Sequence, residues 1–186
     1  EMVFTASGLS GAGLSGHRRE IHMEPDRLGR LECGRKLDPS RDTPATDDIL
    51  TIDGAVTATP DITSVPTKTI GELHIVNNAY ATLSSAASIT LTIAGGASAK
   101  DLEVAAGSTL KLTGSQIVTI SIGATANGVV EGDVIFNATA ASIPHRILAN
   151  QVDGLVFESG ATCAMAPTTT GAGGGFGGSS APTSVD

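Results

Sequence analysis

The chain has 186 residues, a formal net charge of −8 and only 3% aromatic residues, with one Tyr and no Trp. This length favours a single domain with flanking segments, and the scarcity of large rings argues against a compact globular core. The acidic balance argues against nucleic acids and membrane surfaces as partners. No apolar run in the sequence reaches the roughly 20 residues that a membrane span requires.

Residues 1–44 differ from the rest and are interpreted as an irregular arm. A Gly- and Ser-rich stretch is followed by a charged region with as many acidic as basic residues, so a disordered leader is favoured over a basic arm for an acidic partner. We prefer a third hypothesis, in which part of the arm is translated in the wrong frame. If the reading frame is shifted by one nucleotide, the codons of Met23-Glu24 contain a Trp codon, and the shifted peptide can contain the phrases W-N and N-W-T. Residues 23–42 would then be a frame-shifted translation, which sequencing of the encoding DNA tests. Because the chain starts at Glu1 and not at Met, we interpret it as a mature or truncated piece.

From Asp47 onward, short clusters of alternating apolar residues predict β-strands. Apolar residues two positions apart lie on one face of a strand. A first strand is expected at 49–52, and Pro60 and Pro66 restrict their strands to edges or corners. The clusters that follow are Leu73–Ile75, Ala81–Leu83, Leu91–Ile93, Leu102–Val104, Leu110–Leu112, Ile120–Ile122 and Val134–Phe136.

The spacing of these clusters predicts a repeat. The intervals from Ile75 to Ile93 and from Ile93 to Leu112 are nearly equal. A period of about 18–19 residues that holds two strands is typical of one coil of a β-solenoid. We therefore expect an all-β parallel solenoid over residues 45–166, with an antiparallel β-sandwich as the alternative. Residues 167–186 are expected to be a Gly/Ser/Thr-rich tail or a loop between coils.

Acidic residues are the main candidates for chemistry, and two groups are considered. Asp47, Asp48 and Asp53 could hold calcium, but turn-forming roles are favoured. Paired carboxylates at Asp101/Glu103 and Glu131/Asp133 could support general acid–base hydrolysis of a polysaccharide. Because no Lys, Arg, His or aromatic platform is expected beside these pairs, solvated outward acids are favoured. We predict no catalytic, cofactor-binding or metal-ligating residues.

The remaining His, Cys, Asn and Tyr residues are isolated and give no further candidate site. His74 alternates with Leu73 and Ile75 and is expected on the surface. Cys33 and Cys163 lie far apart in the sequence, in segments of different character, and a disulfide between them is disfavoured. The sequence Asn137-Ala138-Thr139 is a glycosylation sequon of a kind that is frequent by chance. Tyr80 is the only Tyr available for sugar stacking.

Three phrases resemble bacterial secreted surface proteins of the autotransporter-like β-strand-repeat and type IX-secreted families. They are D-D-I-L-T-I-D-G (47–54), L-x-V-x-x-G-x-x-L-x-L (102–112) and H-R-I-L-A-N…L-V-F-E-S-G-A-T (145–162). The resemblance implies a right-handed parallel β-helix exported to the cell surface, as a stalk, adhesin or extracellular fibre.

We therefore expect a non-catalytic structural element of a secreted or surface-exposed bacterial protein, located outside the cell. The alternative is a carbohydrate-binding or polysaccharide-degrading β-helix module. A solenoid segment exposes its end strands, and the sequence shows no amphipathic helix that could cap them. The expected partners are therefore like chains, or a continuation of the same solenoid, joined head to tail, with glycans as a further class.

Overall fold

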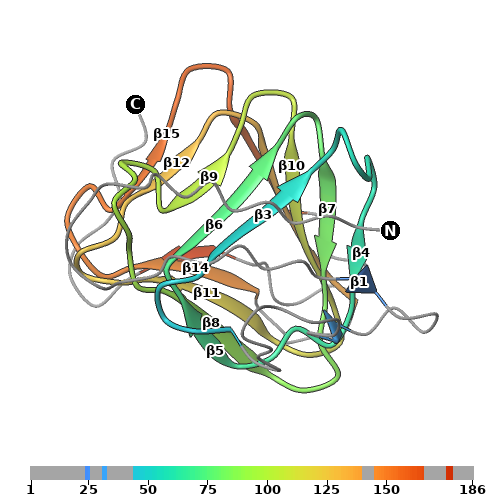
Figure 1. Ribbon diagram of the computed structural model, residues 1–186. Helices are drawn as coiled ribbons and strands as arrows, with labels where there is room; N and C mark the ends of the chain where they lie inside the picture. Colours follow the sequence, from blue (N-terminus) through green and yellow to red (C-terminus); the bar gives the residue numbers. More distant parts are fainter. Residues whose placement is uncertain (1–23, 26–30, 33–43, 140–144, 166–174, 178–186) are drawn as a thin grey trace.

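The computed structural model describes residues 24–25, 31–32, 44–139, 145–165 and 175–177. In these ranges the regular structure is entirely β, and no helix there is long and apolar enough to cross a membrane. The short strands β1 (Glu24–Pro25) and β2 (Leu31–Glu32) pair antiparallel with each other. The other strands form three five-stranded sheets that enclose a common interior (Figure 1).

The chain visits the three sheets in turn, and each strand is hydrogen-bonded to the strand of the same sheet one coil away. Sheet 1 contains β3 (Ile49–Asp53), β6 (Glu72–Val76), β9 (Leu102–Val104), β12 (Gly128–Val130) and β15 (Leu155–Phe157). Sheet 2 contains β4 (Asp61–Ile62), β7 (Tyr80–Leu83), β10 (Thr109–Gly114), β13 (Asp133–Ala138) and β16 (Thr162–Met165). Sheet 3 contains β5 (Lys68–Ile70), β8 (Ile89–Ile93), β11 (Val118–Ile122), β14 (Arg146–Ala149) and β17 (Gly175–Gly177).

All pairings within these three sheets are parallel, so the predicted parallel β-solenoid is confirmed. An antiparallel sandwich would require hairpins between consecutive strands. Here consecutive strands belong to different sheets instead. Parallel neighbours therefore come from successive coils of the chain.

The predicted coil period is too short, and the register that it implied is wrong. Ile93 pairs with Ile70 of the preceding coil and Ile122 of the following coil, and not with Leu112. Leu112 pairs with Leu83 and Phe136 in sheet 2. Each coil holds three strands and not two, and the third strand adds the missing residues.

The coil length varies because the corners between the sheets vary, most of all the corner between sheet 3 and sheet 1. Gly71 alone separates β5 from β6, whereas residues 94–101 separate β8 from β9. A Cβ at position 71 would lie 3.0 Å from the backbone of Asp47, so a larger residue in this shortest corner would require that backbone to shift by a few tenths of an ångström. The longest corner forms the polar site described below.

The core is a set of apolar columns that run along the solenoid axis. The alternating apolar residues of the seven predicted clusters are all buried, which confirms the predicted core face. In sheet 3 the column Ile70–Ile93–Ile122 is fully buried, and burial of one such side chain contributes about 1.5–3 kcal/mol. Sheet 2 contributes a second column through Leu83, Leu112 and Phe136.

His145 is a polar residue inside this core, at the corner before β14. Its side chain is fully buried, and its Nδ1 accepts a hydrogen bond from the Val118 N–H at 3.2 Å. Burial lowers the pKa of His145 from its ordinary value of 6.5, opposed in part by the backbone groups of Asn137 and Gly114. The folded protein therefore holds this ring neutral near pH 7.

Replacement of Ile93 or Leu112 by Ala is expected to lower the free energy of unfolding by about 2–5 kcal/mol, because each removes a link of a buried column. Thr92→Ala is the matched control, since Thr92 is next to Ile93 but only half-buried. Thermal melting measures all three variants. Melting of Ile93→Ala or Leu112→Ala like the wild type would contradict the column register.

Stability is expected to fall as the pH drops below about 6.5 towards the lowered pKa of folded His145. In that window the unfolded chain binds a proton that the folded chain refuses, so unfolding becomes more favourable. His145→Gln removes this proton and keeps an acceptor for the Val118 N–H. Urea unfolding between about pH 8 and pH 5 should show the wild-type advantage over His145→Gln shrinking on acidification; a constant difference would contradict the assignment.

Candidate functional site

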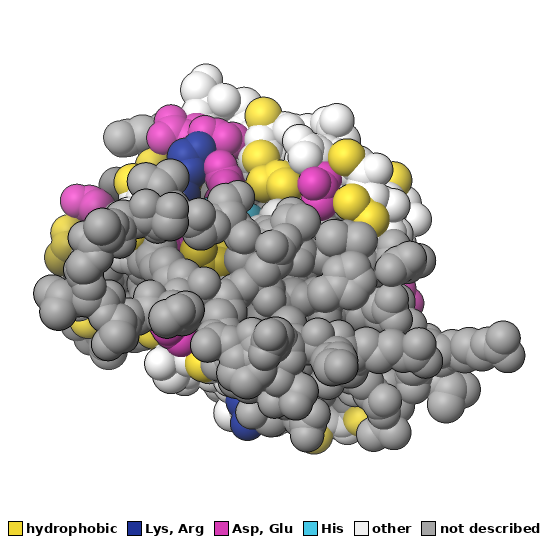
Figure 2. Space-filling model, in the orientation of Figure 1, with side chains coloured by type: hydrophobic (Ala, Val, Ile, Leu, Met, Phe, Trp, Pro, Cys, Tyr) yellow, Lys and Arg dark blue, Asp and Glu magenta, His cyan; other side chains and the backbone are white. Residues whose placement is uncertain are grey.

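The outer face of sheet 1 bears a chain of alternating acidic and basic side chains, here named the charged ladder. Figure 2 shows a basic group enclosed by acidic side chains over the β9 and β12 region of Figure 1. The members are held together by two ion pairs of Lys100 and by two contacts of the His74 ring with carboxylates, and they lie on or next to β6, β9 and β12. In order of contact they are Glu72, His74, Glu103, Lys100 and Glu131.

His74 joins the first two carboxylates of the ladder. Its Nε2 lies 3.1 Å from Oε2 of Glu72, and its Nδ1 lies 3.2 Å from Oε2 of Glu103. Parallel pairing sets the second contact, because His74 and Glu103 are register partners on β6 and β9. A protonated ring donates to both carboxylates, whereas a neutral ring donates to one.

Lys100 extends the ladder to the next coil. Its Nζ lies 3.2 Å from Oε1 of Glu103 and donates to Oε1 of Glu131 at 2.7 Å. The hydrogen bond to Glu131 is the main cause that raises the pKa of Lys100, burial opposes it, and Glu103 adds to it. Lys100 is therefore a charged cross-link between two carboxylates that belong to successive coils of the chain.

The long corner of residues 94–101 folds over Glu72, the first member of the ladder. Glu72 is 2% exposed, and its Oε1 accepts the Ser98 N–H at 3.3 Å. Gly96 passes so close to Glu72 that a Cβ would collide with the carboxylate. Asp101 is also 2% exposed, and it accepts the N–H groups of Gly96 at 2.6 Å and Asn127 at 2.7 Å. Asp101 thus fastens the corner to the following coil.

The structure corrects three expectations about the acidic pairs. Asp101 does not share a solvated outer face with Glu103, because it is buried in the corner. Glu131 follows β12 of sheet 1, whereas Asp133 begins β13 of sheet 2 and accepts the hydroxyl of Thr162. The expectation that no basic residue accompanies the acids is wrong, because His74 and Lys100 both contact Glu103.

Sequence reasoning missed the ladder because its partners come from different coils. His74 and Glu103 lie in successive coils, so their contact can be anticipated only with the correct coil length. A signal was present in the phrases Leu73-His74-Ile75 and Leu102-Glu103-Val104, whose apolar–polar–apolar patterns are register partners in the structure. His74 was expected on the surface; it faces outward but its side chain is only 18% exposed.

In the first acidic group, the carboxylates of Asp48 and Asp53 accept hydrogen bonds from backbone N–H groups nearby in the chain. Asp48 is 1% exposed, and its carboxylate accepts the Ala45 N–H. Asp53 accepts the Ala55 N–H and the side-chain amide of Asn77, both at 2.8 Å through Oδ1. Asp47 is exposed. Among the described residues, no group of three His, Cys, Asp or Glu side chains is arranged to hold a metal ion.

The remaining isolated residues lie in separate places. Cys163 is an exposed free thiol on β16, while Cys33 lies outside the described residues. The frame-shift hypothesis for residues 23–42 falls mostly outside them as well. Asn137 lies on β13, and its side-chain amide donates to Oγ1 of Thr113 at 3.3 Å. Tyr80 is exposed at the start of β7.

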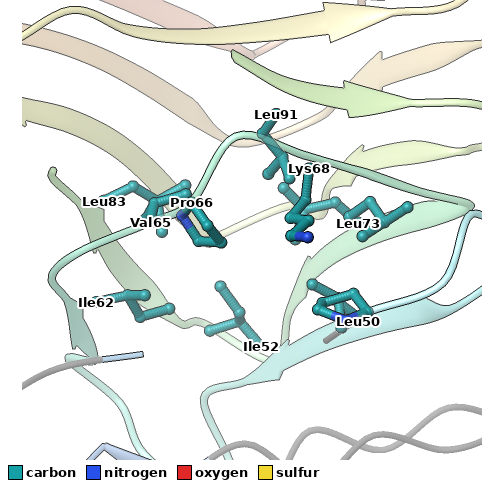
Figure 3. A pocket seen from close by; sticks show the side chains of 11 residues that line it. Leu50, Ile52, Ile62, Val65, Pro66, Lys68, Leu73, Leu83 and Leu91 are labelled. Carbon is teal, nitrogen blue, oxygen red and sulfur yellow. The ribbon is translucent and has the colours of Figure 1, made fainter. Parts of the chain in front are cut away.

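A hollow of about 30 Å³ lies inside the first two coils, away from the ladder (Figure 3). It is lined by apolar side chains, and the ammonium-bearing side chain of Lys68 is the exception. Lys68 occupies an inward position of β5, because its register partner Leu91 is buried. The lining residues are Pro44, Leu50, Ile52, Ile62, Val65, Pro66, Lys68, Ile70, Leu73, Leu83 and Leu91.

The ladder can therefore cross-link coils, and its carboxylates are engaged by His74, Lys100 or backbone N–H groups. The hollow described above is small and apolar, and none of the ladder residues lines it. Comparison of the chain with protein-family models, curated proteins and solved structures finds no match.

Replacement of Lys100 by Met is expected to lower the free energy of unfolding by no more than about 1 kcal/mol at low salt, because Lys100 is partly exposed and screened by water. The effect should approach zero near about 1 M salt, where repulsion between Glu103 and Glu131 is screened. Lys111→Met is the matched control and should show no salt dependence, since no ion pair of Lys111 is found in the described part of the chain. A salt-independent loss for Lys100→Met would argue against the ladder.

Proposed function

We propose that this chain is a non-catalytic structural element of a secreted or surface-exposed bacterial protein, such as a stalk, an adhesin or an extracellular fibre subunit. In this role its partners are like chains, or a continuation of its own solenoid, joined head to tail, with glycans as a further class. The three phrases quoted above support the secreted location by resemblance. The proposal concerns the solenoid at 45–166, which contains nearly all of the described strands.

The single observation that carries the proposal is that each of the three carboxylates of the charged ladder contacts a basic side chain, His74 or Lys100. Glu103 is contacted by His74 and Lys100, and Glu72 by His74 and a backbone N–H. Charges arranged in this way stabilise the alignment of neighbouring coils. The buried column of Ile52, Ile75 and Val104 on the inner face of sheet 1 has the same effect, so both faces of this sheet support a rigid rod.

A polysaccharide-binding or polysaccharide-degrading module is the second candidate. It is favoured by one observation, the presence of Glu72 and Glu103 on either side of His74. Carboxylate pairs of this kind serve glycoside hydrolysis in other folds. A glycan array with wild type, Tyr80→Ala and Glu103→Gln separates the candidates: binding or cleavage lost in either variant would favour the carbohydrate role.

The structural proposal predicts exposure of the chain on intact cells of the bacterium that produces it. Antibody labelling and proteinase K treatment of unpermeabilised cells should detect and remove the solenoid. A cytoplasmic protein, released only by lysis, is the control. Labelling of this chain that requires permeabilisation would overturn the proposed location.

A further inference from the structure

The outer face of sheet 3 carries hydroxyl groups where sheet 1 carries charges. Side chains alternate between the two faces of a strand, so the inward apolar columns identify the outward residues of β5, β8 and β11. Every outward residue of these three strands is a Thr or a Ser. This set is here named the hydroxyl face, and its members are Thr69, Thr90, Thr92, Thr119 and Ser121.

Parallel pairing arranges the hydroxyl face in two rows along the solenoid axis. Thr69, Thr92 and Ser121 are register partners in one row, and Thr90 and Thr119 are register partners in the other. The three strands lie beside one another along one side of the solenoid (Figure 1). Neighbouring strands of a sheet are about 4.7–4.9 Å apart, and alternate residues of a strand are about 6.6 Å apart. The five side chains therefore form a grid with these two repeats.

Most hydroxyls of this face are left unused by the protein. Oγ of Ser121 accepts the Asn150 side-chain amide at 3.0 Å. Within the described ranges no hydrogen-bond partner is found for the side chains of Thr69, Thr90, Thr92 and Thr119. Thr119 is the most informative of these, because it is only 8% exposed. A polar group that is so enclosed needs a hydrogen-bond partner, and its hydroxyl is available to one outside the protein.

A grid of this chemistry is suited to ordered water. A Thr side chain presents a methyl group, beside which water is restricted in orientation, and a hydroxyl that both donates and accepts hydrogen bonds. A charge would be costly to desolvate, and the outward positions of the three strands carry none. The grid ends at β14, where Arg146 and Leu148 occupy the two rows. Its two repeats are similar to the spacings of water molecules on a prism face of hexagonal ice.

We propose that the hydroxyl face binds ice. The Thr hydroxyls and the water beside the Thr methyl groups continue the surface layer of the crystal. Each contact is weak, but the contacts form together because they are linked in one structure. The buried columns beneath the face hold the grid in place before it binds, which lowers the entropy cost. The inference goes beyond the proposed structural role and does not depend on it.

A crystalline polysaccharide is the other repetitive surface that bears hydroxyl groups. Its sugar rings present flat apolar faces, which aromatic side chains match best. The hydroxyl face contains no aromatic ring, and Tyr80, the only Tyr of the chain, lies on β7 of sheet 2. The composition of the face therefore favours ice.

Slow growth of an ice crystal in a cold solution of the full chain tests the inference directly. A dissolved protein that does not bind ice is excluded from a slowly growing crystal. This chain should instead be enriched in the ice, compared with an unrelated acidic protein of similar size, and it should inhibit recrystallisation in a frozen sucrose solution. Exclusion of the chain to the same degree as the unrelated protein would overturn the inference.

Substitutions identify the face that binds. Thr92→Tyr places a large ring in the middle of one row and should abolish enrichment in ice, because the neighbouring hydroxyls can no longer reach the crystal. Thr82→Tyr is the matched control, since Thr82 is a half-buried outward residue of β7 in sheet 2, and it should leave enrichment unchanged. Lys100→Met on sheet 1 should also bind ice like the wild type. Enrichment that survives Thr92→Tyr, or that Thr82→Tyr removes equally, would contradict the assignment.

Thermal melting shows whether each variant is folded. If Thr92→Tyr does not fold, Thr69→Lys in the same row replaces it, and it should also lose enrichment because the new charge must be desolvated. Ice enrichment of a folded Thr69→Lys variant at the wild-type level would count against the hydroxyl face.

Sedimentation with microcrystalline cellulose and with chitin tests the competing ligand. The wild-type chain should stay in solution with both. Retention on either polymer that Thr92→Tyr abolishes would assign the hydroxyl face to a polysaccharide and overturn the inference.

Discussion

The structure depends on the in-register stacking of inward side chains between successive coils. Ile70, Ile93 and Ile122 lie above one another in sheet 3 and are fully buried. A slip of one residue between parallel strands would turn every inward side chain outward. The columns therefore fix the register of all three sheets, while the corners between sheets remain free to differ. Gly71 alone fills one such corner, and the whole segment 94–101 fills the equivalent corner of the next coil.

The charged ladder follows from the same stacking on the outer face. Once Ile75 lies beside Val104 in the core, His74 must lie beside Glu103 outside. A slip of two positions would keep the inward face inward but would bring Glu72 beside Glu103, and like charges that face each other are destabilising. The long corner covers Glu72, which explains why a carboxylate on the outer face is almost fully buried. Individual pairs of this kind contribute little free energy, and their main effect is to favour one alignment.

A solenoid of this kind is stabilised through nearest neighbours, so its inner and end coils are not equivalent. Leu112 has apolar partners in the coils on both sides, whereas Met165 has Phe136 on one side and is half-exposed. In the first coil, by contrast, an inward position is occupied by a charged residue, Lys68. The first and last described coils therefore differ from the inner coils in the charge and exposure of their inward positions.

The sequence by itself determined most of the strands and the buried face of each, although β5 and β12 lie outside the predicted clusters. The apolar residues from Leu73 to Phe136 alternate with polar ones, and this local period of two follows from strand geometry alone. It did not determine which strands are neighbours. Corners of different length hide the coil period, so that Ile93 and Leu112 look equivalent although they belong to different sheets. Only the tertiary structure decided that His74, Lys100 and Glu103 meet, because their contacts join different coils and depend on coil lengths that local patterns do not contain.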